Sequence, residues 1–147
     1  MNALIIVADL GNLRAYRQTV DAYTQSKSLD LLEDVANPDA HLRFGETVTD
    51  QAGRFPSGGP MASGGMSHGE NHHTEAENQK RRVRFIANQI NRIVDRESAL
   101  PWNFAAPQQS NRAILGQVRP DLRERLRKNL SVDLTKAAQK ELMERFS

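Results

Sequence analysis

Cysteine is absent from this sequence of 147 residues. Its absence excludes disulfide bonds, thiolate nucleophiles and cysteine-ligated zinc or iron–sulfur centres. It also fits a reducing compartment, so we expect the protein in the cytoplasm. At this length, and with 38% hydrophobic residues, the chain is expected to fold as one domain around its own core.

Long apolar runs are also lacking. No stretch approaches the ~20 apolar residues that cross a bilayer, so we expect no membrane partner. The short run Ala3–Ala8 has no basic region ahead of it and is followed at once by Asp9. This pattern predicts a buried strand rather than a secretory signal.

Catalytic signatures are missing too. The sequence has no Ser-His-Asp pattern, no Walker loop and no GxGxxG motif. The segment SGGPMASGGM is rich in glycine but lacks the Lys-Ser/Thr pair of a phosphate-binding loop. The pattern therefore favours a flexible segment, and no residue is assigned a catalytic role.

Net charge is small as well. A formal charge of +2 is too low to indicate nucleic-acid binding by itself. Positive charge is instead concentrated in two segments, residues 80–96 and 112–128. Aromatic residues, which stack on bases, are sparse in the first of them, where Phe85 stands alone.

Hydrophobic patterns predict an α/β or α+β domain over residues 1–147. Strands are expected at residues 2–8, 13–17 and 29–35, joined as a meander. Residues 39–71 have no sustained period and predict a long mobile loop, which is then followed by a long helix. The remaining chain predicts a strand at 100–107, helices at 110–118 and 120–126, a strand at 130–134 and a last helix capped by Thr135.

These elements add up to a mixed β-sheet of about five strands with flanking helices. That is the general plan of an RNase-H-like domain. An unpaired edge of the meander could join two copies as a homodimer. The helix after the loop is the clearest element, with a predicted start near His73 or Thr74 and a predicted end near Glu97 or Ser98. Its apolar stripe consists of Val83, Ile86, Ile90, Ile93 and Val94.

Several stretches resemble a known family. They include LIIVADLGNLRAYR, DQAGRFPS, HHTEAENQKRRVRFIANQI and FAAPQQSNRAILGQVRPDLRERL. On these stretches the chain resembles the bacterial host-attachment proteins, the "protein required for attachment to host cells". That family is similar in turn to the central domain of archaeal and eukaryotic class-1 peptide release factors, which has an RNase-H-like fold.

The release-factor resemblance implies a loop, a tip and a basic helix. In those factors a GGQ tip on a long loop precedes the helix, and its glutamine reaches the ribosomal peptidyl-transferase centre. Here the loop tip would be formed by Gly58, Gly59, Gly64 and Gly65, but Pro60 and Met66 follow the two glycine pairs. Because the glutamine is missing, we do not expect peptidyl-tRNA hydrolysis. The ribosome or tRNA stays the partner that the resemblance implies.

The basic helix supplies the candidate nucleic-acid contacts. Lys80, Arg81, Arg82 and Arg84 span more than one turn, so they cannot all face the core. The alternative is an ordinary solvated face. Arg54, beside Gly53 in the loop, could bind a phosphate through both arms of its guanidinium. Its alternative role is to hold the loop to the body together with Phe55.

Two further clusters have metal-capable groups. His68, His72, His73 and Glu77 carry imidazole and carboxylate groups that suit a divalent metal, but their spacing matches no zincin pattern. The alternative is a polar helix start. Asp9 and Asn12 follow the first strand, where a turn is favoured over a carboxylate nuclease site. Such a site needs several acids that converge on a pair of metals, and sequence alone shows no second partner for Asp9.

Three functions are therefore carried forward. The first is a non-enzymatic protein that binds RNA or the ribosome through the glycine-rich loop and the basic helix. The second is a factor that contributes to attachment to host cells or surfaces, acting indirectly because nothing in the sequence indicates export. The third is a metal-dependent hydrolase that uses the His/Glu cluster. No cofactor is expected, apart from a divalent metal under the third hypothesis.

Overall fold

A mixed sheet of five strands forms the centre of the computed structural model, which describes residues 2–38 and 61–146. The strands are β1 (Ala3–Ala8), β2 (Asn12–Val20), β3 (Lys27–Ala36), β4 (Trp102–Ala105) and β5 (Leu126–Leu130). Their order is β3-β2-β1-β4-β5. The first three strands pair antiparallel, whereas β4 is parallel to both β1 and β5. The predicted meander and mixed five-stranded sheet are confirmed.

The hairpin between β1 and β2 is closed by Asp9. Its Oδ1 accepts hydrogen bonds from the backbone N–H groups of Gly11 and Asn12, at 2.7 and 2.8 Å. An aspartate that satisfies the backbone two and three residues ahead stabilises a tight turn. The turn interpretation of Asp9 is confirmed.

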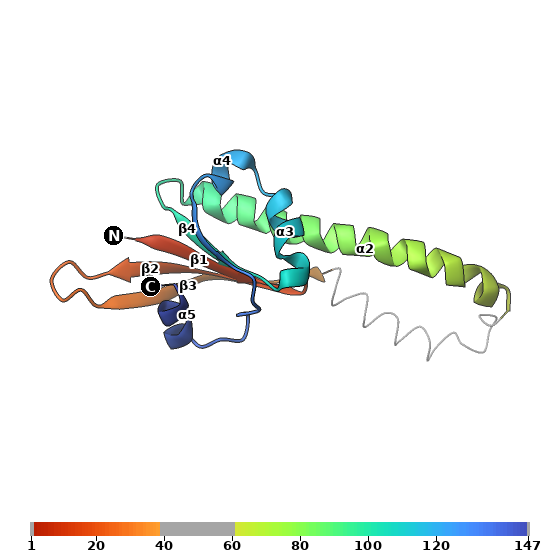
Figure 1. Ribbon diagram of the computed structural model, residues 1–147, viewed down its shortest axis with the longest axis horizontal. Helices are drawn as coiled ribbons and strands as arrows, with labels where there is room; N and C mark the ends of the chain where they lie inside the picture. The colour runs from red at the N-terminus through yellow and green to blue at the C-terminus, as the bar shows by residue number, and fades with distance from the viewer. Residues whose placement is uncertain (1, 39–60, 147) are drawn as a thin grey trace.

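Helices cover both faces of the sheet. Figure 1 shows α2 (Met61–Arg96), α3 (Gln108–Gly116) and α4 (Pro120–Arg123) on one face, and α5 (Gln139–Arg145) on the other. The strand β1 is buried throughout because alternate side chains enter the two cores. Leu4 and Ile6 pack in the core beneath α2, while Ile5 and Val7 pack in the core beneath α5.

The stripe predicted for α2 is confirmed, but the predicted start is wrong. Val83, Ile86 and Ile90 are buried in the core. The helix begins at Met61 rather than near His73, so Gly64 and Gly65 lie in its first turns. Once the packed half of a helix has formed, each further residue adds a backbone hydrogen bond, which can outweigh the ~1 kcal/mol cost of a glycine. Residues 39–60 of the predicted loop lie outside the described residues.

The carboxyl-terminal strand is also displaced from its prediction. It spans Leu126–Leu130 instead of residues 130–134. It is an edge strand with three exposed side chains in its middle, so it carries no apolar alternation. The alternation that suggested a strand instead reflects Leu130, Val132 and Leu134 packing in the core beneath α5.

Two helix boundaries differ as well. Thr135 does not cap the last helix, because its N–H and Oγ1 both donate to Asp133 Oδ1, at 2.9 and 2.6 Å, and the N-cap is Ala138. The helix α4 starts at the predicted Pro120 but ends at Arg123. No helix within residues 2–38 and 61–146 is long and apolar enough to cross a membrane.

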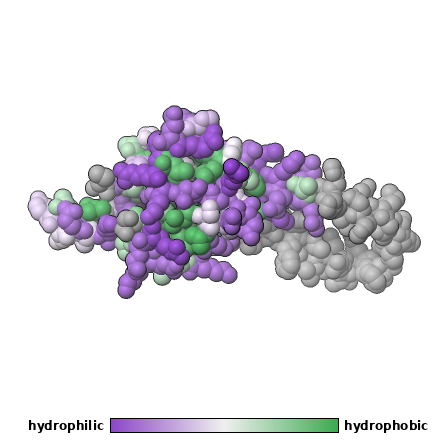
Figure 2. Space-filling view, in the orientation of Figure 1, coloured by the Kyte–Doolittle hydropathy of each residue, from purple (hydrophilic) through white to green (hydrophobic). Residues whose placement is uncertain are grey.

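One face of the molecule is mostly hydrophilic. Figure 2 shows apolar side chains in small patches on a face that is otherwise covered by hydrophilic ones. Among the described residues, the exposed large hydrophobic side chains are Tyr23 (96%) and Leu31 (50%). Leu31 lies in β3, an edge of the sheet, and Tyr23 lies in the turn between β2 and β3. Pairing of two copies through this edge stays a prediction.

Candidate functional site

The surface of α2 presents the predicted basic cluster. Because Val83 and Ile86 turn toward the sheet, the side chains of Lys80, Arg81 and Arg84 are exposed. Arg82 is half-buried, and its backbone carbonyl accepts a hydrogen bond from Asn37 Nδ2 at 3.3 Å. Lys80, Arg81 and Arg84 thus face solvent, while Arg82 lies where α2 meets the end of β3.

Farther along α2 the cations are neutralised. Glu33 on β3 accepts two hydrogen bonds from Arg92, at 2.8 and 2.6 Å, and one from Arg96 at 2.8 Å. The hydrogen bonds from Arg92, followed by those from Arg96, lower the pKa of Glu33 from 4.5 to about 2, although its partial burial opposes the shift. Arg92 and Arg96 therefore hold the helix to the sheet.

The second basic segment is largely structural too. The guanidinium of Arg125 donates to the backbone carbonyls of Val94, Glu97 and Leu100, at 3.3, 2.7 and 2.5 Å, where α2 ends. Arg119 pairs with Asp121 at 2.7 Å and with Asp95 at 3.3 Å. Lys128 donates to the carbonyl of Arg145 at 3.0 Å, at the end of α5. These contacts complete helix ends and connect elements, so the charge of these three residues is largely committed to the fold. Arg112 and Arg123 of the same segment are exposed.

Lys80 and Arg84 differ from those cations. Neither side chain makes a hydrogen bond or an ion pair with the part of the chain that the structure describes. Between them, Arg81 donates from Nη2 to Asn78 Oδ1. Lys80 and Arg84 stand four residues apart, one turn of the helix, and so lie on the same side of α2. Their charge is therefore available to an anion.

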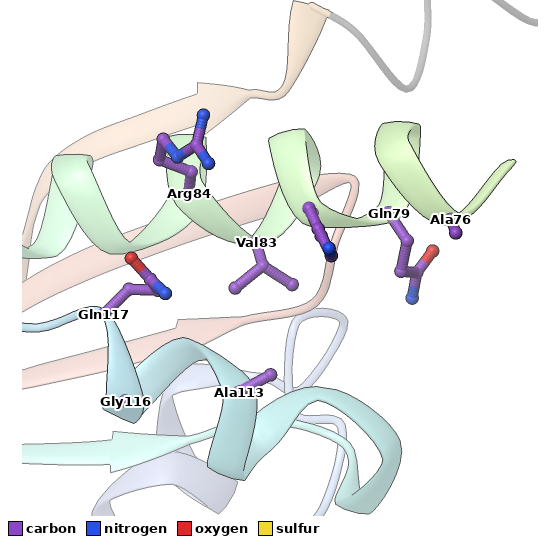
Figure 3. A pocket seen from close by; sticks show the side chains of 8 residues that line it. Ala76, Gln79, Val83, Arg84, Ala113, Gly116 and Gln117 are labelled. Atoms are coloured by element: carbon purple, nitrogen blue, oxygen red, sulfur yellow. The ribbon is translucent and has the colours of Figure 1, made fainter. Parts of the chain in front are cut away.

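A groove runs between α2 and α3 beside these two residues. Its volume is about 750 Å³. It is lined by Ala76, Gln79, Lys80, Val83, Arg84, Ala113, Gly116 and Gln117. Figure 3 shows Val83 and Ala113 pointing toward each other across the groove, while the guanidinium of Arg84 turns away from α3. A Cβ added at Gly116 would meet no atom within 4 Å, so the groove is open beside this residue.

A second hollow lies on the other side of Arg84. Its volume is about 390 Å³, and it is lined by Asn37, Pro38, Arg81, Arg84, Phe85 and Asn88. Arg84 therefore stands on the ridge between the two hollows. We call the exposed surface formed by Lys80, Arg81 and Arg84 the α2 basic surface.

The structure leaves the position of most of the remaining predicted site residues, or of their side chains, undescribed. Arg54, Gly58 and Gly59 lie outside the described residues, and Gly64 and Gly65 are helical. His68, His72 and His73 lie in α2, but their side chains are not described, and Glu77 is exposed. Within the described ranges no group of three or more His, Asp or Glu side chains could hold a metal. The metal site stays a prediction.

Sequence reasoning missed the α3 side of the groove. Ala113, Gly116 and Gln117 carry no chemistry that singles them out in the sequence. The available signal is their size: Ala76, Ala113 and Gly116 are small residues on two helices that pack on the same face of the sheet. Small residues at facing positions leave space between helices, but only the tertiary arrangement shows that they face each other.

Comparison with known proteins places the chain in a family. A search of curated proteins found no match. A protein family described as "Protein required for attachment to host cells" matches residues 4–146, which is nearly the whole chain. The match contains all five strands of the sheet, apart from the first residue of β1, Ala3, and all the described helices. The chain therefore belongs to the family of proteins required for attachment to host cells.

Proposed function

We propose that this protein is a non-enzymatic RNA-binding member of its family, and that the α2 basic surface binds the phosphates of RNA. The observation that carries the proposal is the contrast in charge pairing along α2. Arg92 and Arg96 are bound to Glu33, whereas Lys80 and Arg84 have no partner among the described residues. Unpaired cations that share one face can replace condensed counterions on a phosphate backbone.

The shape of the surface supports the same proposal. Arg84 stands between two hollows, so a phosphate chain that crosses α2 at this residue has space on either side. A guanidinium is suited to phosphate because it donates two parallel hydrogen bonds from a planar group.

The release-factor resemblance connects this RNA to the ribosome. The sheet order β3-β2-β1-β4-β5, with only β2 antiparallel to the others, is consistent with an RNase-H-like fold. A release-factor-like domain of that fold would bring α2 to ribosomal RNA or tRNA. The absence of glutamine after both glycine pairs argues against hydrolysis of peptidyl-tRNA, so we propose binding without catalysis.

Direct binding tests this function. Fluorescence anisotropy with labelled single-stranded RNA should show that the wild-type protein binds RNA. Co-sedimentation with purified ribosomes should show that it binds ribosomes. The double variant Lys80→Gln/Arg84→Gln should bind at least about tenfold more weakly, because each phosphate contact adds to affinity. Arg123→Gln is the matched control, since this exposed arginine on α4 lies outside both hollows. Wild-type protein that binds neither RNA nor ribosomes would refute the proposal.

A role in attachment is the second proposed function, and the family match favours it. We propose that the role is indirect and that the protein acts from the cytoplasm. A deletion strain should adhere less to host cells, and the wild-type gene should restore adhesion. If the double variant restores adhesion as well as wild type does, attachment does not depend on the α2 basic surface. Recovery of the protein from the cell surface after fractionation would contradict the indirect role.

A further inference from the structure

We infer that the groove between α2 and α3 is a binding site for one nucleotide unit, which we call the seat. The base would lie on the groove floor, and the phosphate would lie along the α2 side of the groove, the α2 rim. This inference deepens the proposed function, and for RNA as the source of the nucleotide it rests on it. The shared ligand chemistry is a nucleoside monophosphate. It could be supplied as free nucleotide or as an unpaired residue of single-stranded RNA.

The volume of the groove and its apolar floor both suit a nucleotide base. A volume of about 750 Å³ lies within the range of about 300–1,000 Å³ that small-molecule sites occupy. The floor is apolar, because Val83 and Ala113 face each other across it and Gly116 has no side chain. Every base has an apolar π-face that gains from contact with such a floor. Entry requires an unpaired base, so the groove should distinguish single strands from duplexes.

Two amides suit the edge of a base. Gln79 on α2 and Gln117 beyond the end of α3 both line the groove. Both side chains are exposed, and neither makes a hydrogen bond within the described ranges. A glutamine amide offers both a donor and an acceptor, the combination needed to pair with a base edge. The groove thus has polar groups on both of its walls.

The distribution of charge fixes the orientation of the ligand. Both cations that line the groove, Lys80 and Arg84, come from α2, and its lining on the α3 side is uncharged. The phosphate therefore belongs at the α2 rim and the base toward α3. A bare phosphate would use the two cations alone and leave the floor empty.

The leucine variant Gly116→Leu tests the seat. A Cβ added at this position meets no protein atom within 4 Å, and Gly116 lines the groove, so we expect a leucine here to occupy part of the groove without disturbing the fold. The position ends α3, where helix propensity favours leucine over glycine. The matched control is Gln109→Leu, which places the same side chain on an exposed position of α3 outside the groove. Fluorescence of Trp102, the only tryptophan, reports that each variant is folded.

Isothermal titration with inorganic phosphate and with each nucleoside monophosphate gives the first result. Wild type and Gln109→Leu should bind a nucleotide at least about tenfold more tightly than phosphate, the equivalent of one favourable base contact. Gly116→Leu should lose this difference. If Gly116→Leu does not fold, Gln117→Leu, which removes an amide from the wall, should lower nucleotide affinity instead. Nucleotide affinity equal to that of phosphate in wild type would overturn the inference.

Labelled single-stranded and duplex RNA separate the two proposals. Wild type should prefer the single strand, and Gly116→Leu should lose that preference while its affinity for duplex stays the same. If wild type binds RNA and Gly116→Leu binds it identically, the seat is refuted and the proposed RNA binding stands. If wild type binds nucleotides but no RNA, the seat is supported for free nucleotides and the proposed function falls.

Discussion

The Glu33 carboxylate on β3 accepts hydrogen bonds from two nitrogens of Arg92 on α2, at 2.8 and 2.6 Å. This ion pair connects β3, an edge strand of the sheet, to the long helix α2. The Glu33 side chain is only 20% exposed, so water screens the pair less than it would on an open surface. The contact also consumes the positive charge of Arg92.

Acid should therefore weaken the fold through Glu33. The folded state lowers the pKa of this carboxyl from 4.5 to about 2. A depressed pKa stabilises the fold above pH 4.5, and that contribution is lost as the pH falls toward 2. Because both arginines are partly exposed, we discount the contribution to about 1–2 kcal/mol.

Glu33→Gln isolates that contribution. At pH 7 the variant should have a free energy of unfolding lower than that of wild type by about 1–2 kcal/mol. Urea unfolding followed by Trp102 fluorescence at pH 7, 4.5 and 2.5 measures it, and the gap between the proteins should shrink as the pH falls. A gap that stays constant over this range would show that Glu33 does not titrate as described. Asp21 and Asp121, whose pKa values are also lowered, are common to both proteins and cancel in the comparison.

Arg125→Met should destabilise the fold by about 1–3 kcal/mol. The substitution removes the guanidinium that satisfies the carbonyls of Val94, Glu97 and Leu100 at the end of α2. Methionine keeps much of the apolar stem, so the loss reports the hydrogen bonds. Thermal unfolding measures the effect. Arg123→Met, at an exposed position on α4, is the control, and an equal loss in both variants would contradict the capping role.

Asp9→Ala should cost about 1 kcal/mol, because the N–H groups of Gly11 and Asn12 lose their acceptor. Asp9→Asn keeps an Oδ1 acceptor and should recover most of the stability. Chemical unfolding of the three proteins at pH 7 distinguishes these outcomes. Equal stability of Asp9→Ala and wild type would show that the turn does not depend on this side chain.

How far the sequence predicted the fold depends on which interactions are local. The continuous apolar run of β1 and the helical periodicity of the stripe from Val83 to Val94 are local signals, and both were predicted correctly. The strand β5 was misplaced because its exposed Arg127 and Lys128 carry no pattern that marks an edge strand. The sequence does not predict the early start of α2, because the low helix propensity of Gly64 and Gly65 argues against a helix there. In the structure the helix extends from its packed half through these glycines.

The candidate site was predictable only in part. Sequence identified the cations of α2 but could not separate Arg92, which binds Glu33, from Lys80 and Arg84, which have no partner among the described residues. That distinction depends on a contact between residues 59 positions apart in the chain. The groove likewise depends on the packing of α3 against α2, which local patterns do not encode.

The salt dependence of RNA binding tests the central claim most directly. The dissociation constant of single-stranded RNA should be measured across a range of salt concentrations for wild type, Lys80→Gln, Arg84→Gln and the control Arg123→Gln. If Lys80 and Arg84 each bind one phosphate, each single variant should lower the slope of log affinity against log salt by about 0.7 relative to wild type, while the control keeps the wild-type slope. Identical slopes in all four proteins would contradict the account.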